Sequence, residues 1–196
     1  MSDANFNWPW LFRTVHLYLS MFGFFIILFF AVTGFTLNRI DWFAQEMENR
    51  RTLEGDFPAE LLASEDKLAI VEYIRATYPV RGAVTSIQGD PEDYEYMVVF
   101  KRPGALSEAS IDRETLRITV IIESYGAVAV LNDLHLGRDA GAGWKLAIDF
   151  TALLMALLSL TGLVLIFTMR KGRTQRLVTA AGGLLFFVLV YAVFVP

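Results

Sequence analysis

The sequence predicts a mainly α-helical membrane protein with three transmembrane helices and a small α+β domain inserted between helices one and two. The first observation is composition: the 196-residue chain is 55% hydrophobic, with a mean hydropathy of +0.44. Such a chain is too apolar for an ordinary soluble domain. The second is length: segments 11–37, 144–169 and 177–195 meet or nearly meet the roughly 20 residues that a spanning helix requires.

Charges are almost absent from these predicted spans. The first has no charge after Arg13, and the second confines Lys145 and Asp149 to its first turns. The third has none. The first apolar run is longer than the roughly 7–15 residues of a signal peptide, and no A-x-A cleavage site follows it. We therefore expect a retained membrane anchor.

Basic residues set the expected orientation. The short loop between spans two and three holds Arg170, Lys171, Arg173 and Arg176. The positive-inside rule makes this loop and the N-terminus cytoplasmic, and it places segment 38–143 outside. The absence of cysteine excludes disulfides, iron–sulfur clusters and a thiol nucleophile. We expect a bacterial inner membrane, a periplasmic domain, and no nucleic-acid partner because the basic cluster is only this turn.

Segment 38–143 predicts the extracytoplasmic domain and the return to the membrane. Residues 38–62 are interpreted as an amphipathic transition, and Ser64 is expected to cap a helix that Pro79 ends. Short strands follow at 83–87, 94–100, 107–112 and 116–122, with turns at Gly89-Asp90-Pro91 and Arg102-Pro103-Gly104. One helix and a small antiparallel sheet make an α+β domain.

Only two histidines occur, His16 and His135, and each stands at one end of a long apolar stretch. An ionisable side chain in a membrane span is costly, so it indicates a function by default. In both halves a His-Leu pair precedes a Thr-Gly pair. The pairs are His16-Leu17 with Thr33-Gly34 and His135-Leu136 with Thr161-Gly162. This order favours a repeated helix–histidine unit, although Thr-Gly is also common in membrane helices.

These residues resemble the PepSY-associated transmembrane family over most of the chain. The resemblance rests on the run Leu131-Asn132-Asp133-Leu134-His135-Leu136-Gly137-Arg138, on His16-Leu17-Tyr18-Leu19, and on the PepSY-like helix and strands after Glu65. It implies a haem-containing reductase that delivers electrons to ferric iron or ferric siderophores on the periplasmic side. Larger members duplicate the membrane unit, whereas this chain has one. It therefore either pairs with another copy or serves another role.

The predicted topology separates the two histidines by the thickness of the membrane, so they cannot share a metal within one subunit. A twofold dimer supplies two histidines at each depth. The hypothesis is a homodimer with one bis-histidine haem between the two His16 residues and another between the two His135 residues. Covalent attachment needs C-x-x-C-H, so the haems would be b-type.

Further residues are candidates for supporting roles. Asp133 or Asn132 is expected to orient the His135 ring, and Arg138 and Arg13 are expected to pair with haem propionates. The phenylalanines of the first span are candidates for the pocket wall: Phe22, Phe24, Phe25, Phe29 and Phe30. Plainer alternatives are a histidine that snorkels to the interface, ordinary interfacial arginines and a lipid-facing phenylalanine surface.

The sequence favours a b-type haem protein that passes electrons to the periplasmic side for iron uptake, with ferric iron or a ferric siderophore as substrate. Its electron donor is not visible, because the chain has no nicotinamide or flavin fingerprint. The glycine-rich 137–143 segment matches neither G-x-G-x-x-G nor a P-loop. The alternative is a cofactor-free anchor whose PepSY-like module binds a partner or serves as an accessory subunit of an envelope complex. Whether the chain is an enzyme stays open between them.

Overall fold

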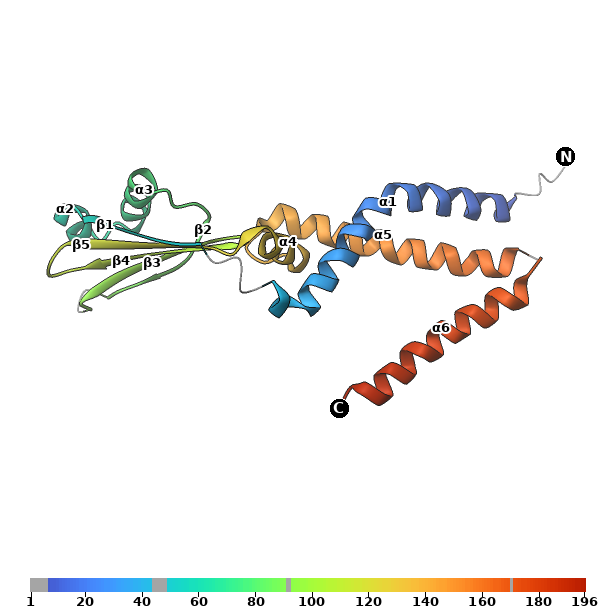
Figure 1. The fold of residues 1–196 in the computed structure, drawn as a ribbon. Coiled ribbons are helices and arrows are strands. Elements are labelled where there is room, and N and C mark those ends of the chain that lie inside the picture. Colours follow the sequence, from blue (N-terminus) through green and yellow to red (C-terminus); the bar gives the residue numbers. More distant parts are fainter. Residues whose placement is uncertain (1–6, 44–48, 91–92, 170) are drawn as a thin grey trace, which may run out of the picture. The chain divides into compact units, whose positions relative to one another are not determined.

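The computed structural model describes residues 7–43, 49–90, 93–169 and 171–196 (Figure 1). Three of its helices are long and apolar enough to cross a membrane: α1 (Trp8–Asn38), α5 (Gly141–Thr168) and α6 (Arg173–Phe194). A five-stranded antiparallel sheet lies between α1 and α5 in the chain. The predicted fold class is therefore confirmed. Pro91 of the predicted turn and Arg170 of the basic loop lie outside the described residues.

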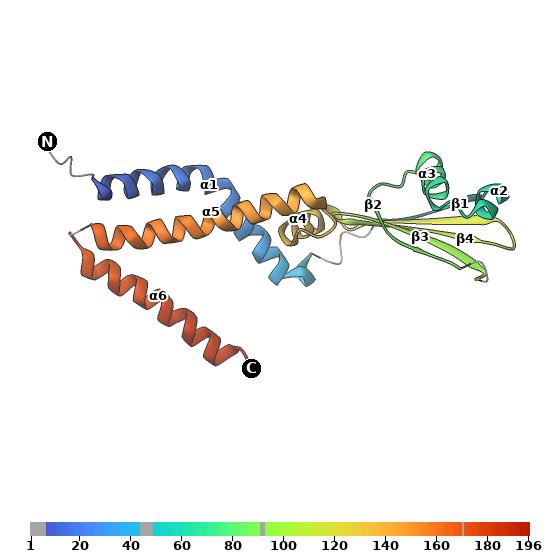
Figure 2. The same cartoon turned by 180° about the vertical axis from the view of Figure 1, so that it is seen from behind.

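The sheet is a meander with one additional edge strand. Its strands are β1 (Asn49–Asp56), β2 (Ala83–Gln88), β3 (Glu95–Arg102), β4 (Ala105–Asp112) and β5 (Arg117–Ser124), in the order β1-β5-β4-β3-β2. Burial alternates along β4, as the two-residue period of a strand requires when one face is covered. The covering elements are the helices α2 (Ala59–Ser64) and α3 (Lys67–Thr77), which both views place on the same side of the sheet (Figure 2).

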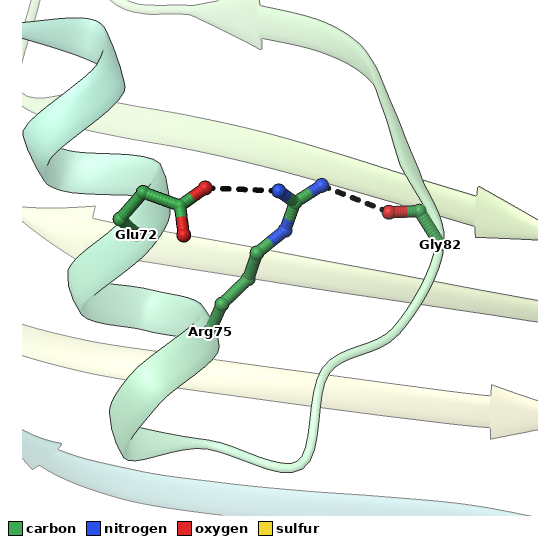
Figure 3. Close-up of polar contacts among 3 residues, drawn as sticks. All are labelled: Glu72, Arg75 and Gly82. Atoms are coloured by element: carbon green, nitrogen blue, oxygen red, sulfur yellow. Dashed lines mark hydrogen bonds and ion pairs between the residues drawn. The ribbon is translucent and has the colours of Figure 1, made fainter.

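The core of this domain lies between α3 and the covered face of the sheet. Ile70 and Ile74 of α3 are fully buried against Phe100 and neighbouring side chains of β3, β4 and β5. Arg75, on the same helix, pairs with Glu72 of α3 at 2.9 Å and donates to the Gly82 carbonyl in the loop before β2 at 3.0 Å (Figure 3). The helix is thus tied to the loop that enters β2.

Two local predictions in this domain are wrong. Residues 49–56 form strand β1 rather than part of an amphipathic transition, because β5 supplies the backbone partners, with Leu53 opposite Val120. Helix α3 is capped by Asp66 rather than Ser64. The Asp66 carboxylate accepts from the backbone N–H groups of Leu68 and Ala69, whereas the Ser64 hydroxyl donates to the Leu61 carbonyl at the end of α2.

A further helix, α4 (Gly126–Leu136), follows the sheet and was not predicted as an element. The β3–β4 hairpin rests on it. Gly104 at the hairpin tip donates its N–H to the Asp133 carboxylate at 2.8 Å, and its φ of +67° favours glycine. A Cβ atom at this position would meet Val130 at 2.4 Å. The hairpin and α4 therefore form one packed corner.

The chain divides into two compact units, one formed by 1–28 with 149–196 and the other by 29–148. In the first unit, the N-terminal part of α1 packs on α5. A Cβ atom at Gly23 would lie 3.2 Å from the buried Leu154 side chain, so this glycine permits the close approach of the two helices. Helix α6 has no buried residue among those described.

Candidate functional site: two histidine–threonine pairs

In the first unit, the His16 ring on α1 is held by a hydroxyl on α5. The His16 Nδ1 atom lies 2.9 Å from the Thr161 Oγ1 atom. Thr161 is buried, whereas His16 keeps part of its ring exposed. The Thr161 hydroxyl also donates to carbonyls of its own helix, at 2.8 Å to Leu157 and 3.0 Å to Leu158.

In the second unit, the His135 ring on α4 is held in the same way by the last part of α1. The His135 Nδ1 atom lies 2.6 Å from the Thr33 Oγ1 atom. Thr33 is 1% exposed, and its hydroxyl donates to the Phe29 carbonyl at 2.6 Å. A neighbouring bond joins the same two helices, because the Thr36 hydroxyl donates to the Asn132 side-chain carbonyl at 2.6 Å.

These bonds are compatible with one tautomer that both rings share. A threonine hydroxyl has one proton, and in each pair a backbone carbonyl of the hydroxyl's own helix lies within hydrogen-bond distance of it. If that carbonyl takes the proton, the hydroxyl oxygen accepts from a ring that is protonated at Nδ1, and Nε2 then presents a lone pair. Neither Nε2 atom has a hydrogen-bond partner among the residues that the structure describes.

A glycine next to each threonine makes room for the ring. A Cβ atom at Gly162 would lie 3.3 Å from the Cε1 atom of His16, and one at Gly34 would lie 3.7 Å from the Cε1 atom of His135. The first distance is tighter than an ordinary van der Waals contact, and the second is ordinary. The Thr-Gly pairs thus supply both the acceptor and the space for the imidazole.

Aromatic side chains contribute unequally. The Phe30 ring packs edge-on against His135, with centroids 4.8 Å apart. Phe29 contacts Phe30 and Trp144, and Phe22 contacts Phe150. Phe24 and Phe25 contact each other and are exposed. Of the five phenylalanines considered for the pocket wall, Phe30 is therefore the one that the structure brings to a histidine.

Among the described residues, the remaining predicted site residues have bonding partners other than the two histidine rings or lie exposed. Asp133 accepts from the Gly104 N–H at 2.8 Å and lies 3.6 Å from Arg138, and Asn132 is bonded to Thr36. Arg138 is exposed apart from this ion pair, and Arg13 lies exposed on α1 before His16. The residue that holds the His135 ring at Nδ1 is Thr33.

The sequence shows Thr33 and Thr161 only as parts of the repeated Thr-Gly pairs. In the structure each threonine contacts the histidine of the other sequence repeat, so Thr161 contacts His16 and Thr33 contacts His135. Consecutive spans run antiparallel, so a histidine near the start of one lies at the depth of a threonine near the end of the other. Applied to His16 and Thr161, this rule would have found the cross-pairing.

Each pair holds one imidazole, which is too few protein ligands for a bare metal ion. A bare zinc ion needs three or four protein ligands. Within the described ranges, no group of three or more His, Cys, Asp or Glu side chains is placed to hold a metal ion. A haem iron is coordinated by its porphyrin and needs only axial ligands, for which a neutral imidazole Nε2 is suitable. Each pair offers one such atom.

Comparison with known proteins gives one family. A family model described as Putative PepSY_TM-like matches residues 10–196, which is nearly the whole chain. The matched region includes both histidine–threonine pairs and the sheet domain. No curated protein and no solved structure matches the chain.

Proposed function

The chain belongs to the putative PepSY_TM-like family, and from that premise we propose that it is a b-type haem membrane protein that passes electrons to ferric iron or a ferric siderophore. The observation that supports this most directly is the contact of each histidine Nδ1 with a threonine hydroxyl, at 2.9 Å for His16 and 2.6 Å for His135. We infer that each hydroxyl accepts from the ring, so that Nδ1 holds the proton and Nε2 keeps its lone pair. That is the state in which a neutral histidine ligates a metal.

The second bond on the ring is typical of a ligand. Histidines that ligate metals almost always donate their other N–H to a fixed acceptor, which sets the ring orientation. Thr33 and Thr161 fill this role, and both are themselves tied to their helices. The partial exposure of both rings and the space at Gly34 and Gly162 also fit a planar group beside the imidazole.

A bound haem would supply reversible one-electron chemistry. The chain's own residues hold the iron ligands at fixed positions and exclude a covalent attachment, because there is no cysteine. Each pair offers a single imidazole, so six-coordinate iron requires a second histidine at the same depth. We infer a homodimer in which both copies of His16 ligate one haem and both copies of His135 ligate another.

The proposal includes a direction and a set of charged contacts. The basic residues between α5 and α6 support a sheet domain on the periplasmic side of a bacterial inner membrane, because the positive-inside rule favours a cytoplasmic side for such a loop. Electrons would then leave near His135, next to the sheet domain. Arg13 and Arg138 remain the proposed partners for haem propionates, because guanidinium groups pair with carboxylates.

An absorption spectrum of the purified full chain tests the proposal. Reduced b-haem bands should survive purification and disappear in part in His135→Ala and in part in His16→Ala. Thr33→Val and Thr161→Val should each weaken haem retention by about 10- to 100-fold, since removing the acceptor on a ligand costs about that much affinity. A pyridine haem assay gives the haem content per chain.

The matched control is Thr179→Val. Among the described residues, the Thr179 hydroxyl bonds only to the Gln175 carbonyl of its own helix, at 3.0 Å, so its loss removes the same group without touching a histidine. Its haem content should equal that of the unsubstituted chain. If His16→Ala retains the full haem content, the paired arrangement is wrong even for a cytochrome.

The competing function is a cofactor-free anchor for a PepSY-like partner-binding module. The same bonds would then serve only to join helices, a role worth about 1 kcal/mol each in a membrane. This function predicts a colourless protein. Thr33→Val would lower its unfolding temperature in detergent, and no variant would change a visible spectrum.

A further inference from the structure

A cavity of about 430 Å³ lies in the second unit, at the corner where α1, α4 and the β3–β4 hairpin meet. Its volume falls within the roughly 300–1,000 Å³ of ligand pockets. Most of its lining is apolar and includes Leu37, Ile40, Leu106, Val128, Ala129 and Leu136. His135 and Thr33 are not among the lining residues, whereas Arg138, the proposed partner of a haem propionate, is one of them.

The cavity lies where a membrane helix ends. Leu37 belongs to the last turn of α1, and Ile40 lies in the short helix η1 (Ile40–Trp42) that follows it. The adjacent Trp42 is 67% exposed, and the Arg39 guanidinium lies 5.1 Å from the centroid of its ring. An exposed tryptophan with a nearby cation is typical of the membrane–water interface. The apolar lining therefore begins at the depth of lipid headgroups.

Three cations and two carboxylates line the cavity: Lys101, Arg102, Arg138, Asp133 and Asp139. Lys101 and Arg102, at the end of β3, are exposed, and neither forms an ion pair with a carboxylate in the described part of the chain. Arg138 is paired with Asp133, whose second oxygen is already occupied by the Gly104 N–H. Two cations are thus left available beside an apolar hollow.

We propose that this cavity binds a phospholipid with an anionic headgroup, drawn from the leaflet on the side of the sheet domain. An acyl chain fills the apolar hollow between α1 and α4. The headgroup phosphate lies against Lys101 and Arg102. The ligand is an amphiphile because the lining combines apolar side chains with the cations Lys101 and Arg102. It comes from the bilayer because the lining includes Leu37 in the last turn of the membrane helix α1.

Lipid retention by the full chain tests this proposal. The protein is reconstituted into vesicles of equal parts phosphatidylglycerol and phosphatidylcholine with identical acyl chains, then extracted, and its bound lipid is quantified by native mass spectrometry. We expect phosphatidylglycerol to be retained about fivefold or more over phosphatidylcholine. The double variant Lys101→Gln/Arg102→Gln should reduce this ratio to near one.

The matched control is Lys67→Gln/Arg81→Gln, which removes two exposed cations of the same domain that do not line the cavity. This variant should keep the preference. Ala129→Phe, which fills the hollow, should reduce retention of both lipids. Its fold is checked by circular dichroism, and the charge variants decide the matter if it does not fold.

Four outcomes would overturn the proposal. The first is equal retention of both lipids by the unsubstituted chain. The second is a control variant that loses the preference as fully as the Lys101→Gln/Arg102→Gln variant. The third is unchanged lipid retention in folded Ala129→Phe. If added inorganic phosphate abolishes the preference while folded Ala129→Phe keeps its lipid, the cations bind phosphate without any contribution from the cavity, and the proposal fails as well.

Discussion

At the scale of single residues, the two histidines are defined by what bonds to Nδ1. A threonine hydroxyl that donates to its own helix accepts from the ring, and in this proposed tautomer Nε2 is left free in both pairs. Thr33 and Thr161 are both buried, whereas both histidines are partly exposed. The same local geometry therefore occurs at two rings in different units of the chain.

The glycine beside each threonine provides a prediction at this scale. Gly162→Ala places a Cβ atom 3.3 Å from the His16 Cε1 atom, so the ring must shift by a few tenths of an ångström. Gly34→Ala places its Cβ atom at 3.7 Å from His135, which is an ordinary contact. We expect the ¹⁵N signals of His16 to move in the first variant, and those of His135 to stay in the second.

Stability provides a second readout for the same pair. Alanine is favoured over glycine within a helix by about 1 kcal/mol. Gly34→Ala should therefore raise the unfolding free energy in detergent by up to that amount, whereas Gly162→Ala should gain less because of the contact. Equal gains, with both histidine signals unmoved, would show that the ring of His16 does not depend on the space at Gly162.

At the scale of elements, the start of α3 shows how a helix end is decided by geometry rather than by residue type alone. Ser64 and Asp66 are both suitable N-cap residues. The carboxylate of Asp66 reaches the N–H groups of Leu68 and Ala69 at 3.0 and 3.2 Å, and Glu65 is left-handed with a φ of +53°. The chain therefore ends α2 at Ser64 and begins α3 after Asp66.

This arrangement predicts the effect of two alanine substitutions. Asp66→Ala should lower the free energy of unfolding by about 1 kcal/mol, because two backbone donors lose their acceptor. Ser64→Ala is the matched control. It should change the free energy by less than about 0.5 kcal/mol, since Ser64 is exposed. Amide hydrogen exchange of α3 in the full chain measures both, and a larger effect for Ser64→Ala would contradict the assignment.

At the scale of the whole molecule, the sheet domain precedes α5 in the chain and the α5–α6 loop follows it. If α5 crosses the membrane, these two segments lie on opposite sides of it. Lys171, Arg173 and Arg176 follow α5. Arg176 donates to the Met169 carbonyl at 2.7 Å, so part of this basic cluster also closes the turn. The positive-inside rule predicts that this turn is cytoplasmic.

The orientation is directly testable because the chain contains no cysteine. A single thiol is introduced at an exposed position of the sheet domain, Thr85→Cys, or at the exposed start of α6, Gln175→Cys. In spheroplasts, a membrane-impermeant maleimide should label the first variant and should label the second only after permeabilisation. The reverse pattern would place the sheet domain in the cytoplasm and would reverse the proposed direction of electron flow.

Much of the architecture is readable in the sequence, because membrane helices and amphipathic strands are determined by local composition and period. The three helices and strands β2 to β5 follow from apolar runs, alternation and turn residues. Strand β1 does not, since Asn49–Asp56 has a charged, mostly exposed sequence whose strand conformation depends on β5. Helix α4 was likewise not predicted from its sequence.

By itself, the sequence determined a three-helix membrane chain with an inserted α+β domain and two isolated histidines, because hydrophobic length and rare ionisable residues are one-dimensional properties. Only the tertiary structure decided which hydroxyl meets which ring. Thr161 reaches His16 and Thr33 reaches His135 because hydrogen bonds join atoms that are close in space, and the histidine and threonine of each pair are far apart in the chain.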